Sequence, residues 1–360
     1  MFTACSADKQ EGRAEKPVVK YMMPAESAPH EGTWLQWPHK YQYGATYRNR
    51  IEPTWIAMTR ELVSGEKVHI IAFNEEVRLD IIDKLTAVGI ALDNVDFYLF
   101  KNNDVWVRDN GPIYVRNVAG GELTIEGWGF NGWGDKEPYA YSEQIPAEVA
   151  KAMRMPFVQL NNEMILEGGA VELDGKGALL ATRSSILNVN RNPGMGQVEA
   201  EALLTTYLGA THFIWLDGVA GLDITDMHID GFARFGEGNQ IITMSRDDLQ
   251  TWELPQKDID YLYSVKNQQG KPYEYVALPL TQNNVVTTYG DDLGYQGSYV
   301  NYYISNDKVL VPTYNDPNDA VAIALIQQLY PTRKAVGIDV RNLYADGGMI
   351  HCVTQQQPRK

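Results

Sequence analysis

The fold is set out most clearly by residues 227–244, which read MHIDGFARFGEGNQIITM. Apolar residues predominate in the first half, residues 227–235, and predict a strand. The glycine-rich residues 236–239 predict a turn, and residues 240–244 predict a strand that returns beside the first. A two-stranded hairpin cannot bury its apolar face alone, so this unit must pack against other parts of the chain.

The same hairpin pattern recurs on both sides of this stretch. A turn at residues 174–177 precedes a strand at 178–182, and a turn at 305–307 joins strands at 298–304 and 309–311. The three turns lie about 60–70 residues apart, a spacing typical of repeat architectures. About five units of hairpin, helix and strand would use up the chain, and we expect them to pack together as a ring.

Apolar residues at helical spacing predict the helices between the hairpins. Asn74 is placed to cap a helix that extends to Val88, and Gly209 is placed to end a helix before the strand at residues 213–216. Further helices are expected at residues 53–64 and 318–329. Their alternation with strands predicts the α/β class.

The composition indicates a globular protein and narrows its partners. Hydrophobic residues make up 44% and charged residues 21% of the chain, which are ordinary values. No apolar run approaches the roughly 20 residues that a membrane-spanning helix needs. The formal net charge of −15 argues against nucleic acid and favours a cationic small molecule. The two cysteines and the histidine spacing indicate neither a disulfide framework nor a zinc site, so we expect no metal and no cofactor.

The N-terminal lead differs from the rest of the chain. Residues 1–22 carry little apolar pattern and predict a disordered lead before a single catalytic domain at residues 23–360. Residues 2–6, FTACS, are similar to the end of a bacterial lipoprotein signal, in which the cysteine is acylated. The residues before Cys5 are too few to act as a signal. We expect a cytoplasmic protein by default, and a membrane-tethered lipoprotein if the natural start lies upstream.

The chain's strongest nucleophile lies in residues 347–358, GGMIHCVTQQQP. Cys352 follows a glycine pair, which allows a tight bend or a close approach of the backbone. Its thiolate would be a strong nucleophile near neutral pH. The plain alternative is a buried core thiol, because the neighbours of Cys352 are largely apolar.

Other chemically capable residues also lie beside glycines at predicted strand ends. They are Asp109, Glu167, His228, Asp230 and Cys352. Equivalent strand ends converge on the axis of a ring of repeats, so these side chains could meet there. Two carboxylates suit a planar guanidinium, a thiolate can attack its central carbon, and a histidine can move the protons.

Six stretches extend this chemistry into a family resemblance. Together they closely resemble the agmatine deiminases and their bacterial relatives, within the guanidino-group-modifying enzymes that share the pentein fold: WVRDNGP at 106–112, LEGG at 166–169, NRNP at 190–193, DITDMHID at 223–230, GSYVN at 297–301 and IHCVTQQQP at 350–358. The resemblance covers about residues 23–358. It implies a five-bladed α/β propeller with pseudo-fivefold ββαβ repeats and no cofactor. The sequence does not determine the oligomeric state, and a homo-oligomer is one alternative.

The resemblance also implies catalytic roles. Cys352 would be the nucleophile, and His228 the general acid and base with Glu167 beside it. Asp109 and Asp230 would clamp the guanidinium. The alternatives are structural: Asp109 could pair with a neighbouring arginine, Glu167 could cap a turn, and His228 with Asp230 could be a satisfied core pair.

Further residues are expected to bind the substrate. Trp106 would pack against its stem, although plain core packing is an equal alternative. Asp226 and Asn301 are expected among the substrate-binding residues. Two departures from the family pattern, Met227 and Met349, place larger apolar side chains near the presumed pocket.

The substrate is less certain from sequence than the chemistry. In several relatives an acidic residue lies four positions before the catalytic histidine, where this chain has Ile224. We expect a deiminase that converts agmatine to N-carbamoylputrescine and ammonia, within polyamine synthesis. The alternatives are arginine or peptidyl-arginine as substrate, a metal hydrolase using His228, Asp230 and His351, and a non-catalytic binding propeller suggested by 8 Trp and 21 Tyr.

Overall fold

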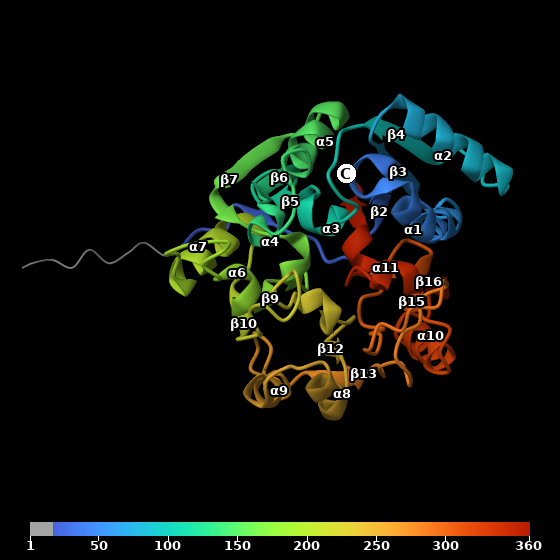
Figure 1. Cartoon of the computed structure of the whole chain (residues 1–360). Coiled ribbons are helices and arrows are strands. Elements are labelled where there is room, and N and C mark those ends of the chain that lie inside the picture. The colour runs from blue at the N-terminus through green and yellow to red at the C-terminus, as the bar shows by residue number, and fades with distance from the viewer. Residues whose placement is uncertain (1–16) are drawn as a thin grey trace, which may run out of the picture.

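Five small sheets surround a common centre in the computed structural model, which describes residues 17–360 (Figure 1). Every sheet contains an antiparallel pair of neighbouring strands and a further strand added in parallel. The parallel strand follows helices that lie on the outer side of the ring (Figure 1). Each sheet is therefore a blade of the type ββαβ, and the predicted five-bladed α/β propeller is confirmed.

Three blades are continuous in sequence. Their elements are β8 (Val171–Leu173), β9 (Ala178–Thr182), α6 (Arg183–Ile186), α7 (Gln197–Leu208) and β10 (His212–Leu216); β11 (Ala233–Phe235), β12 (Gln240–Thr243), α8 (Arg246–Thr251), α9 (Gln256–Leu262) and β13 (Glu274–Ala277); and β14 (Tyr303–Ile304), β15 (Lys308–Thr313), α10 (Asn318–Leu329) and β16 (Lys334–Asp339). These blades contain the three hairpins predicted from the turn spacing.

The other two blades take in distant segments. One contains β1 (Tyr21–Met22), β5 (Ile113–Asn117), β6 (Leu123–Gly129), η1 (Ser142–Gln144), α5 (Ile145–Met153) and β7 (Phe157–Ile165). The other contains β17 (Gln355–Pro358), β2 (His30–Gln36), α1 (Lys40–Leu62), β3 (Lys67–Ala72), α2 (Glu75–Ala87) and β4 (Val95–Leu99). The last strand of the chain, β17, pairs antiparallel with β2. The two ends of the described chain therefore close the ring together.

The predicted N-terminal boundary lies too late. Residues 17–22 fall within the expected disordered lead, yet Tyr21–Met22 forms β1 and pairs antiparallel with Arg116 and Asn117 of β5. The backbone pairing that orders this segment comes from residues far away in sequence, so no local pattern announces it. Cys5, the proposed acylation site, lies outside the described residues.

Capping residues set the ends of several helices, as predicted. The Asn74 side chain accepts a hydrogen bond from the Val77 backbone and opens α2. Gly209 ends α7 at φ +76°, a left-handed conformation that glycine adopts freely. Helix α1 is longer than predicted, because it begins at Lys40 and continues through a kink at Gly44.

Two predicted strands are shorter in the structure. The strand expected at residues 227–235 is confined to β11, because Asp226 and Met227 adopt left-handed backbone angles of +60° and +73°. A short turn, η3 (Ile229–Gly231), then leads into β11. The strand expected at residues 298–304 is confined to β14. Both departures give irregular backbone at the centre of the ring.

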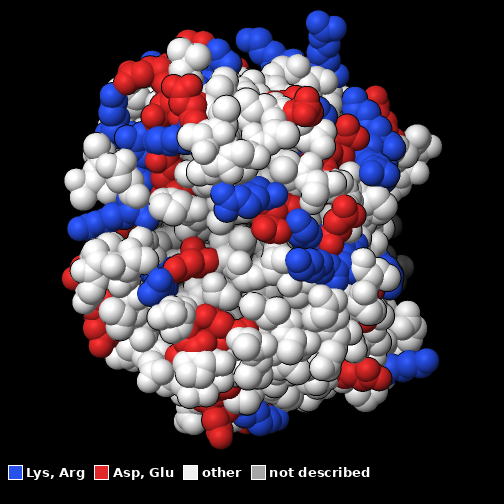
Figure 2. All heavy atoms as spheres, turned by 90° about the vertical axis from the view of Figure 1, so that its right-hand side faces the viewer, with Lys and Arg blue, Asp and Glu red and all other residues white. Residues whose placement is uncertain are grey.

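Apolar side chains between the blades and their outer helices form the core. Leu35, Trp55 and Ile70 are buried in the largest of three clusters, which also includes residues from the blades of β12 and β15. Among residues 17–360, no helix combines the length and the apolar character needed to cross a membrane. On the face that carries α1 and α10, acidic and basic side chains are interspersed with uncharged ones (Figure 2). That face offers no continuous basic surface for a polyanion.

Four short turns approach one another at the centre. They are α3 (Val107–Asn110), η2 (Gly168–Ala170), η3 and η4 (His351–Val353). Each belongs to the segment that leads into or out of a blade strand, so irregular backbone from distant parts of the chain gathers on the axis. The predicted site residues lie on these turns or beside them.

Candidate active site

The central turns bring the predicted catalytic residues to one cavity of about 380 Å³. Asp109 comes from α3, Asp230 from η3 and Cys352 from η4, and all three line the cavity. His228 precedes η3 and also lines it, whereas Glu167 lies behind His228 and precedes η2. Residues separated by more than 200 positions thus meet as the ring model predicted.

Gly169 allows the charged groups to come this close. A Cβ atom at this position would lie 2.7 Å from Asp109 Oδ1, 2.7 Å from His228 Nδ1 and 3.1 Å from Asp230 Oδ2. Only a residue without a side chain fits beneath all three groups. Gly169 of the LEGG stretch is therefore required by the packing of the site, whereas Gly168 lies against the Arg108 backbone, where a Cβ would be 2.2 Å from the carbonyl oxygen.

His228 lies between two carboxylates. Its Nε2 is 2.9 Å from Glu167 Oε2, and its Nδ1 is 3.5 Å from Asp109 Oδ1. Burial alone would lower the pKa of His228, but Asp109 and Glu167 together outweigh burial and raise the pKa to about 9. At neutral pH His228 is therefore an imidazolium that can donate a proton.

Glu167 remains ionised because of its other partner. Arg191 Nε donates to Glu167 Oε1 at 2.7 Å, and both side chains are buried. Burial would raise the pKa of Glu167, but His228 and Arg191 outweigh it and lower the pKa. Arg191 belongs to the quoted NRNP stretch, yet the sequence analysis assigned it no role.

Asp109 faces the cavity with its charge only partly compensated. Trp133 Nε1 donates to Oδ2 at 2.9 Å, and the Gly169 backbone donates to Oδ1 at 3.2 Å. Burial, reinforced by Asp230 and Glu167, raises the pKa of Asp109 to about 6. The sequence analysis left open that Asp109 forms a structural ion pair with Arg108. In the structure, Arg108 pairs with Glu26 instead.

Cys352 lies beside Asp230 and Asn301. Its Sγ is 3.4 Å from Asn301 Oδ1 and 3.9 Å from Asp230 Oδ2. Burial, with Asp230 and Asp109, raises the pKa of the Cys352 thiol well above its usual range. A cation held between the two carboxylates would offset their charge and favour the thiolate. The arrangement thus couples formation of the nucleophile to a cationic ligand.

Asn301 supports the nucleophile more directly than it faces a ligand. Its Oδ1 accepts from the His351 backbone at 3.0 Å, and its Nδ2 donates to the Asp230 carbonyl at 3.2 Å. The side chain is fully buried although it reaches the cavity wall. Its predicted substrate contact therefore remains a proposal, beside an evident role in holding η3 and η4 together.

Asp226 does not lie where the sequence prediction placed it. Its Oδ2 accepts from Arg191 at 2.6 Å and from Lys136 at 2.8 Å, and it is absent from the cavity lining. The left-handed backbone at Asp226 turns the carboxylate toward Arg191 rather than toward the centre. Asp226 therefore supports the arginine that holds Glu167.

The cavity walls are rich in aromatic and sulfur-containing side chains. Trp106, Trp133, Trp252, Met227 and Met349 all line it. Both methionines that depart from the family pattern thus reach the pocket. A Cβ atom at Gly348 would lie 2.1 Å from the Trp106 ring, so the glycine pair before Cys352 lets the backbone pack against that ring.

Three further carboxylates line the cavity. Glu137, Asp223 and Asp346 line the cavity, and among its described lining residues there is no lysine and no arginine. Asp346 is exposed, and the Tyr47 hydroxyl lies beside it. The sequence analysis missed Asp346 because a carboxylate in an exposed turn carries no local functional signal.

Metal ligation is not favoured by the side-chain arrangement. Within residues 17–360, no three His, Cys, Asp or Glu side chains are placed to share a metal ion. His228 and His351 each face carboxylates instead. At the centre, each of these imidazole rings is thus a hydrogen-bond partner of carboxylates.

Comparisons with known proteins agree with this chemistry. Residues 22–358 match the family model described as Porphyromonas-type peptidyl-arginine deiminase. The agmatine deiminase of Pseudomonas fluorescens is 30% identical over 364 residues, which cover 94% of this chain and 95% of that protein. A solved structure of the agmatine deiminase of Enterococcus faecalis is 25% identical with a TM-score of 0.81, and the match covers 94% of this chain and 96% of that one.

Proposed function

Because the chain belongs to the family of agmatine deiminases and Porphyromonas-type peptidyl-arginine deiminases, which are enzymes that hydrolyse guanidino groups, we propose that it converts agmatine to N-carbamoylputrescine and ammonia. The observation that carries this choice of substrate is the charge of the cavity: two carboxylates beside Cys352, three farther away, and neither lysine nor arginine among the described lining residues.

The guanidinium group would lie between Asp109 and Asp230. Two carboxylates match its forked N–H donors, and both groups are buried, where hydrogen bonds to charged groups are strongest. Trp106 offers a flat wall for the aliphatic stem. In this position the central carbon of the guanidinium faces Cys352 Sγ.

The first chemical step would form a covalent intermediate. The bound cation offsets Asp109 and Asp230, so Cys352 releases its proton to solvent and the thiolate attacks the guanidinium carbon. His228, an imidazolium at neutral pH, donates its proton to one nitrogen, and ammonia departs. A cationic thiouronium group then remains on Cys352.

The second step would release the product. The now neutral His228 accepts a proton from water as the water attacks the thiouronium carbon. The C–S bond breaks, the carbon–oxygen bond becomes the carbonyl of a urea group, and the proton of the added hydroxyl leaves with the sulfur. Overall, one guanidinium and one water give a urea group and an ammonium ion, and no cofactor takes part.

The far end of the cavity favours agmatine over free arginine. Agmatine ends in an ammonium group, which Asp346 and its acidic neighbours would attract, whereas the α-carboxylate of arginine would meet like charges there. A peptidyl-arginine has no charge at this point, so it remains the second candidate. The match to the peptidyl-arginine deiminase model and the aromatic wall favour that candidate.

The deciding experiment measures ammonia release from agmatine, free arginine and an acetylated arginine amide, with the wild type and with Cys352→Ala. We expect agmatine to be the best substrate by kcat/KM and the variant to lose at least about 10³-fold in kcat. A preference for the amide would keep the mechanism and assign the peptidyl substrate. No ammonia from any of them would support the non-catalytic binding propeller.

Turnover that survives in Cys352→Ala would contradict the thiolate mechanism. If a chelator then abolished this turnover, the metal hydrolase alternative would replace it.

For the cellular location we keep the cytoplasm as the proposal, with a lipid anchor at Cys5 as the alternative, and the mass of the protein isolated from its natural host distinguishes them. The same preparation, by light scattering, tests the proposed homo-oligomer.

A further inference from the structure

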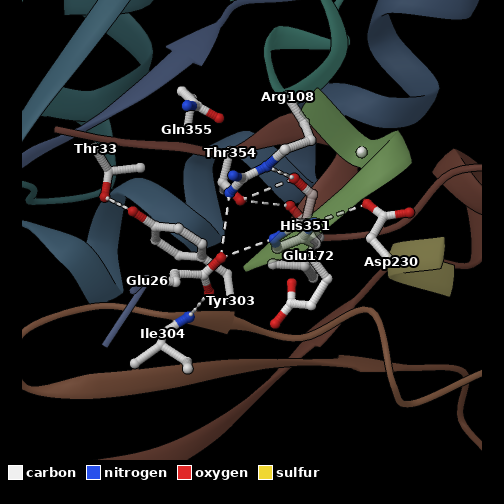
Figure 3. A network of polar contacts seen from close by, with 12 residues as sticks. Glu26, Thr33, Arg108, Glu172, Asp230, Tyr303, Ile304, His351, Thr354 and Gln355 are labelled. Atoms are coloured by element: carbon white, nitrogen blue, oxygen red, sulfur yellow. Dashed lines mark hydrogen bonds and ion pairs between the residues drawn. The ribbon is translucent and has the colours of Figure 1, made fainter. Parts of the chain in front are cut away.

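His351 joins two buried carboxylates behind the cavity (Figure 3). Its Nδ1 lies 2.7 Å from Asp230 Oδ2, and its Nε2 lies 2.7 Å from Glu26 Oε2. The relative exposure of the His351 side chain is 2%, that of Asp230 is 3% and that of Glu26 is 9%. Neither His351 nor Glu26 belongs to the lining of the catalytic cavity.

The geometry requires His351 to donate through both ring nitrogens. A carboxylate oxygen only accepts, and a neutral imidazole has a single N–H, so two ionised partners can be satisfied only by an imidazolium. The surroundings of Glu26 and of Asp230 favour the ionised form of each carboxylate. Burial would raise the pKa of Glu26, but Arg234, His351 and Arg108 outweigh it and hold that pKa well below its usual range. Burial would also raise the pKa of Asp230, but His351 outweighs burial and lowers that pKa.

Glu26 is anchored by three segments of the ring (Figure 3). Arg234 of β11 and Arg108 of α3 lie 3.0 Å and 3.5 Å from its Oε2, and the Ile304 backbone of β14 donates to its Oε1 at 2.8 Å. A carboxylate held from three directions has a fixed position in the core. It can therefore fix the ring of His351, which in turn fixes Asp230.

We propose that Glu26 and His351 are positioning residues for guanidine hydrolysis, acting as a charged relay that orients Asp230 and keeps it ionised beside Cys352. This inference rests on the proposed function in one respect only, which is that the assay uses agmatine as its substrate. The cation at His351 offsets the repulsion between Asp230 and Asp109, which face the same cavity. Glu26 belongs to the segment before β2, in which no sequence motif indicates a chemical role.

The test compares Glu26→Gln with the matched variant Glu172→Gln. Glu172 is buried and accepts from the same Arg234, at 2.9 Å, but makes no hydrogen bond with His351 among the described contacts. Glu26→Gln keeps the shape and removes the negative charge that lies 2.7 Å from His351 Nε2. We expect its KM for agmatine to rise about 10-fold or more, while Glu172→Gln changes KM less than about 3-fold.

The pH dependence separates positioning from general loss of stability. Without the Glu26 charge, the relay holds Asp230 less firmly as a carboxylate, so protonation of Asp230 adds to that of Asp109 and the acid limb of kcat/KM shifts to higher pH. The other charged and titratable groups packed around the relay are Arg108, Arg234, Glu172, Asp109, His228, Cys352 and Tyr303. They are unchanged between the wild type and Glu26→Gln. Glu26→Asp, which restores the charge, should return the acid limb toward that of the wild type.

A binding assay keeps this inference separate from the proposed reaction. Agmatine or guanidinium chloride, bound at Asp230, should protect Cys352 from alkylation by iodoacetamide, as followed by peptide mass. Glu26→Gln should need about 10-fold more ligand for equal protection. Equal protection and an unshifted acid limb in Glu26→Gln would overturn the relay. Wild type that is protected by the cations yet releases no ammonia would instead count against the proposed function alone.

Discussion

Two side chains set the pH window of the reaction at the scale of single residues. Asp109 must be ionised to hold the guanidinium, and its pKa of about 6 means that this charge is lost as the pH falls through that value. His228 must be protonated to release ammonia, and its pKa of about 9 means that this proton is lost as the pH rises through that value. The functional window therefore lies between the two.

The first prediction is a bell-shaped profile of kcat/KM for agmatine, with limbs near pH 6 and pH 9. Steady-state rates from pH 5 to pH 10.5 measure it. A profile that keeps rising above pH 9 would show that the thiol proton leaves the free enzyme, which would contradict its release after substrate binding. Asp109→Asn is the control, since it should remove the contribution of Asp109 to the acid limb together with about 100-fold or more of kcat/KM.

The second prediction concerns Asp346, at the far end of the cavity. Asp346→Asn should raise KM for agmatine about 3- to 5-fold, because an exposed ion pair contributes at most about 1 kcal/mol. It should leave KM for acetylated arginine amide unchanged, since that compound has no ammonium group. Initial rates on both substrates measure the difference. Equal effects on both would assign recognition of the ammonium to other residues. Asp93→Asn serves as the control, because Asp93 is an exposed carboxylate outside the cavity lining.

At the scale of elements, sequence reasoning succeeded where local chemistry decides the structure. Asn74 and Gly209 mark helix ends through their own side chain or backbone freedom, and both act as predicted. The strand expected at residues 227–235 was shortened because the approach of η3 to the centre outweighs local strand preference. The same holds for the site: Cys352 and His228 stand out by type and by family pattern, whereas Glu26 acquires its partners only on folding.

The third prediction addresses the left-handed turn before η3. Met227 has φ +73° and is buried, so its backbone is strained while its side chain packs in the core. Met227→Gly should relieve about 1 kcal/mol of strain but lose about 2–5 kcal/mol of packing, for a net loss of about 1–4 kcal/mol in the free energy of unfolding. Urea denaturation measures this loss, and a gain in stability would show that strain dominates.

The same variant bears on specificity. Removing Met227 enlarges the cavity beside His228, so acetylated arginine amide should gain in kcat/KM relative to agmatine. Met349→Ala is the comparison, because Met349 lines the cavity with ordinary backbone angles. Both variants should widen specificity, but only Met227→Gly should change the rate at which a protease cuts the turn before η3. This result would separate the effect of Met227 on the cavity from its effect on the turn.

At the scale of the whole molecule, the ring is closed by its chain ends, and Gln357 of β17 lies at that closure. Its Oε1 is 3.1 Å from Trp34 Nε1 of β2 and 3.2 Å from the Tyr114 hydroxyl of β5, so one amide joins two blades. The sequence predicts a ring but not this pairing, since the partners are more than 240 residues apart. Closure explains why residues near both ends, Glu26 and Cys352, share one centre.

The fourth prediction follows from that closure. Gln357→Ala should leave the buried Tyr114 hydroxyl without its acceptor, whereas Trp34 Nε1 still donates to that hydroxyl at 2.8 Å. The unsatisfied hydroxyl costs about 1–3 kcal/mol in the free energy of unfolding. Urea denaturation followed by both fluorescence and circular dichroism measures it, with the exposed Gln269→Ala as a control expected to stay within about 0.5 kcal/mol. If the ring folds as one unit, the two probes remain coincident and activity falls in the same transition. Separate transitions in Gln357→Ala would instead show that the blades of this variant unfold in independent groups. The amide of Gln357 would then be the group that couples the blade of Cys352 to its neighbour.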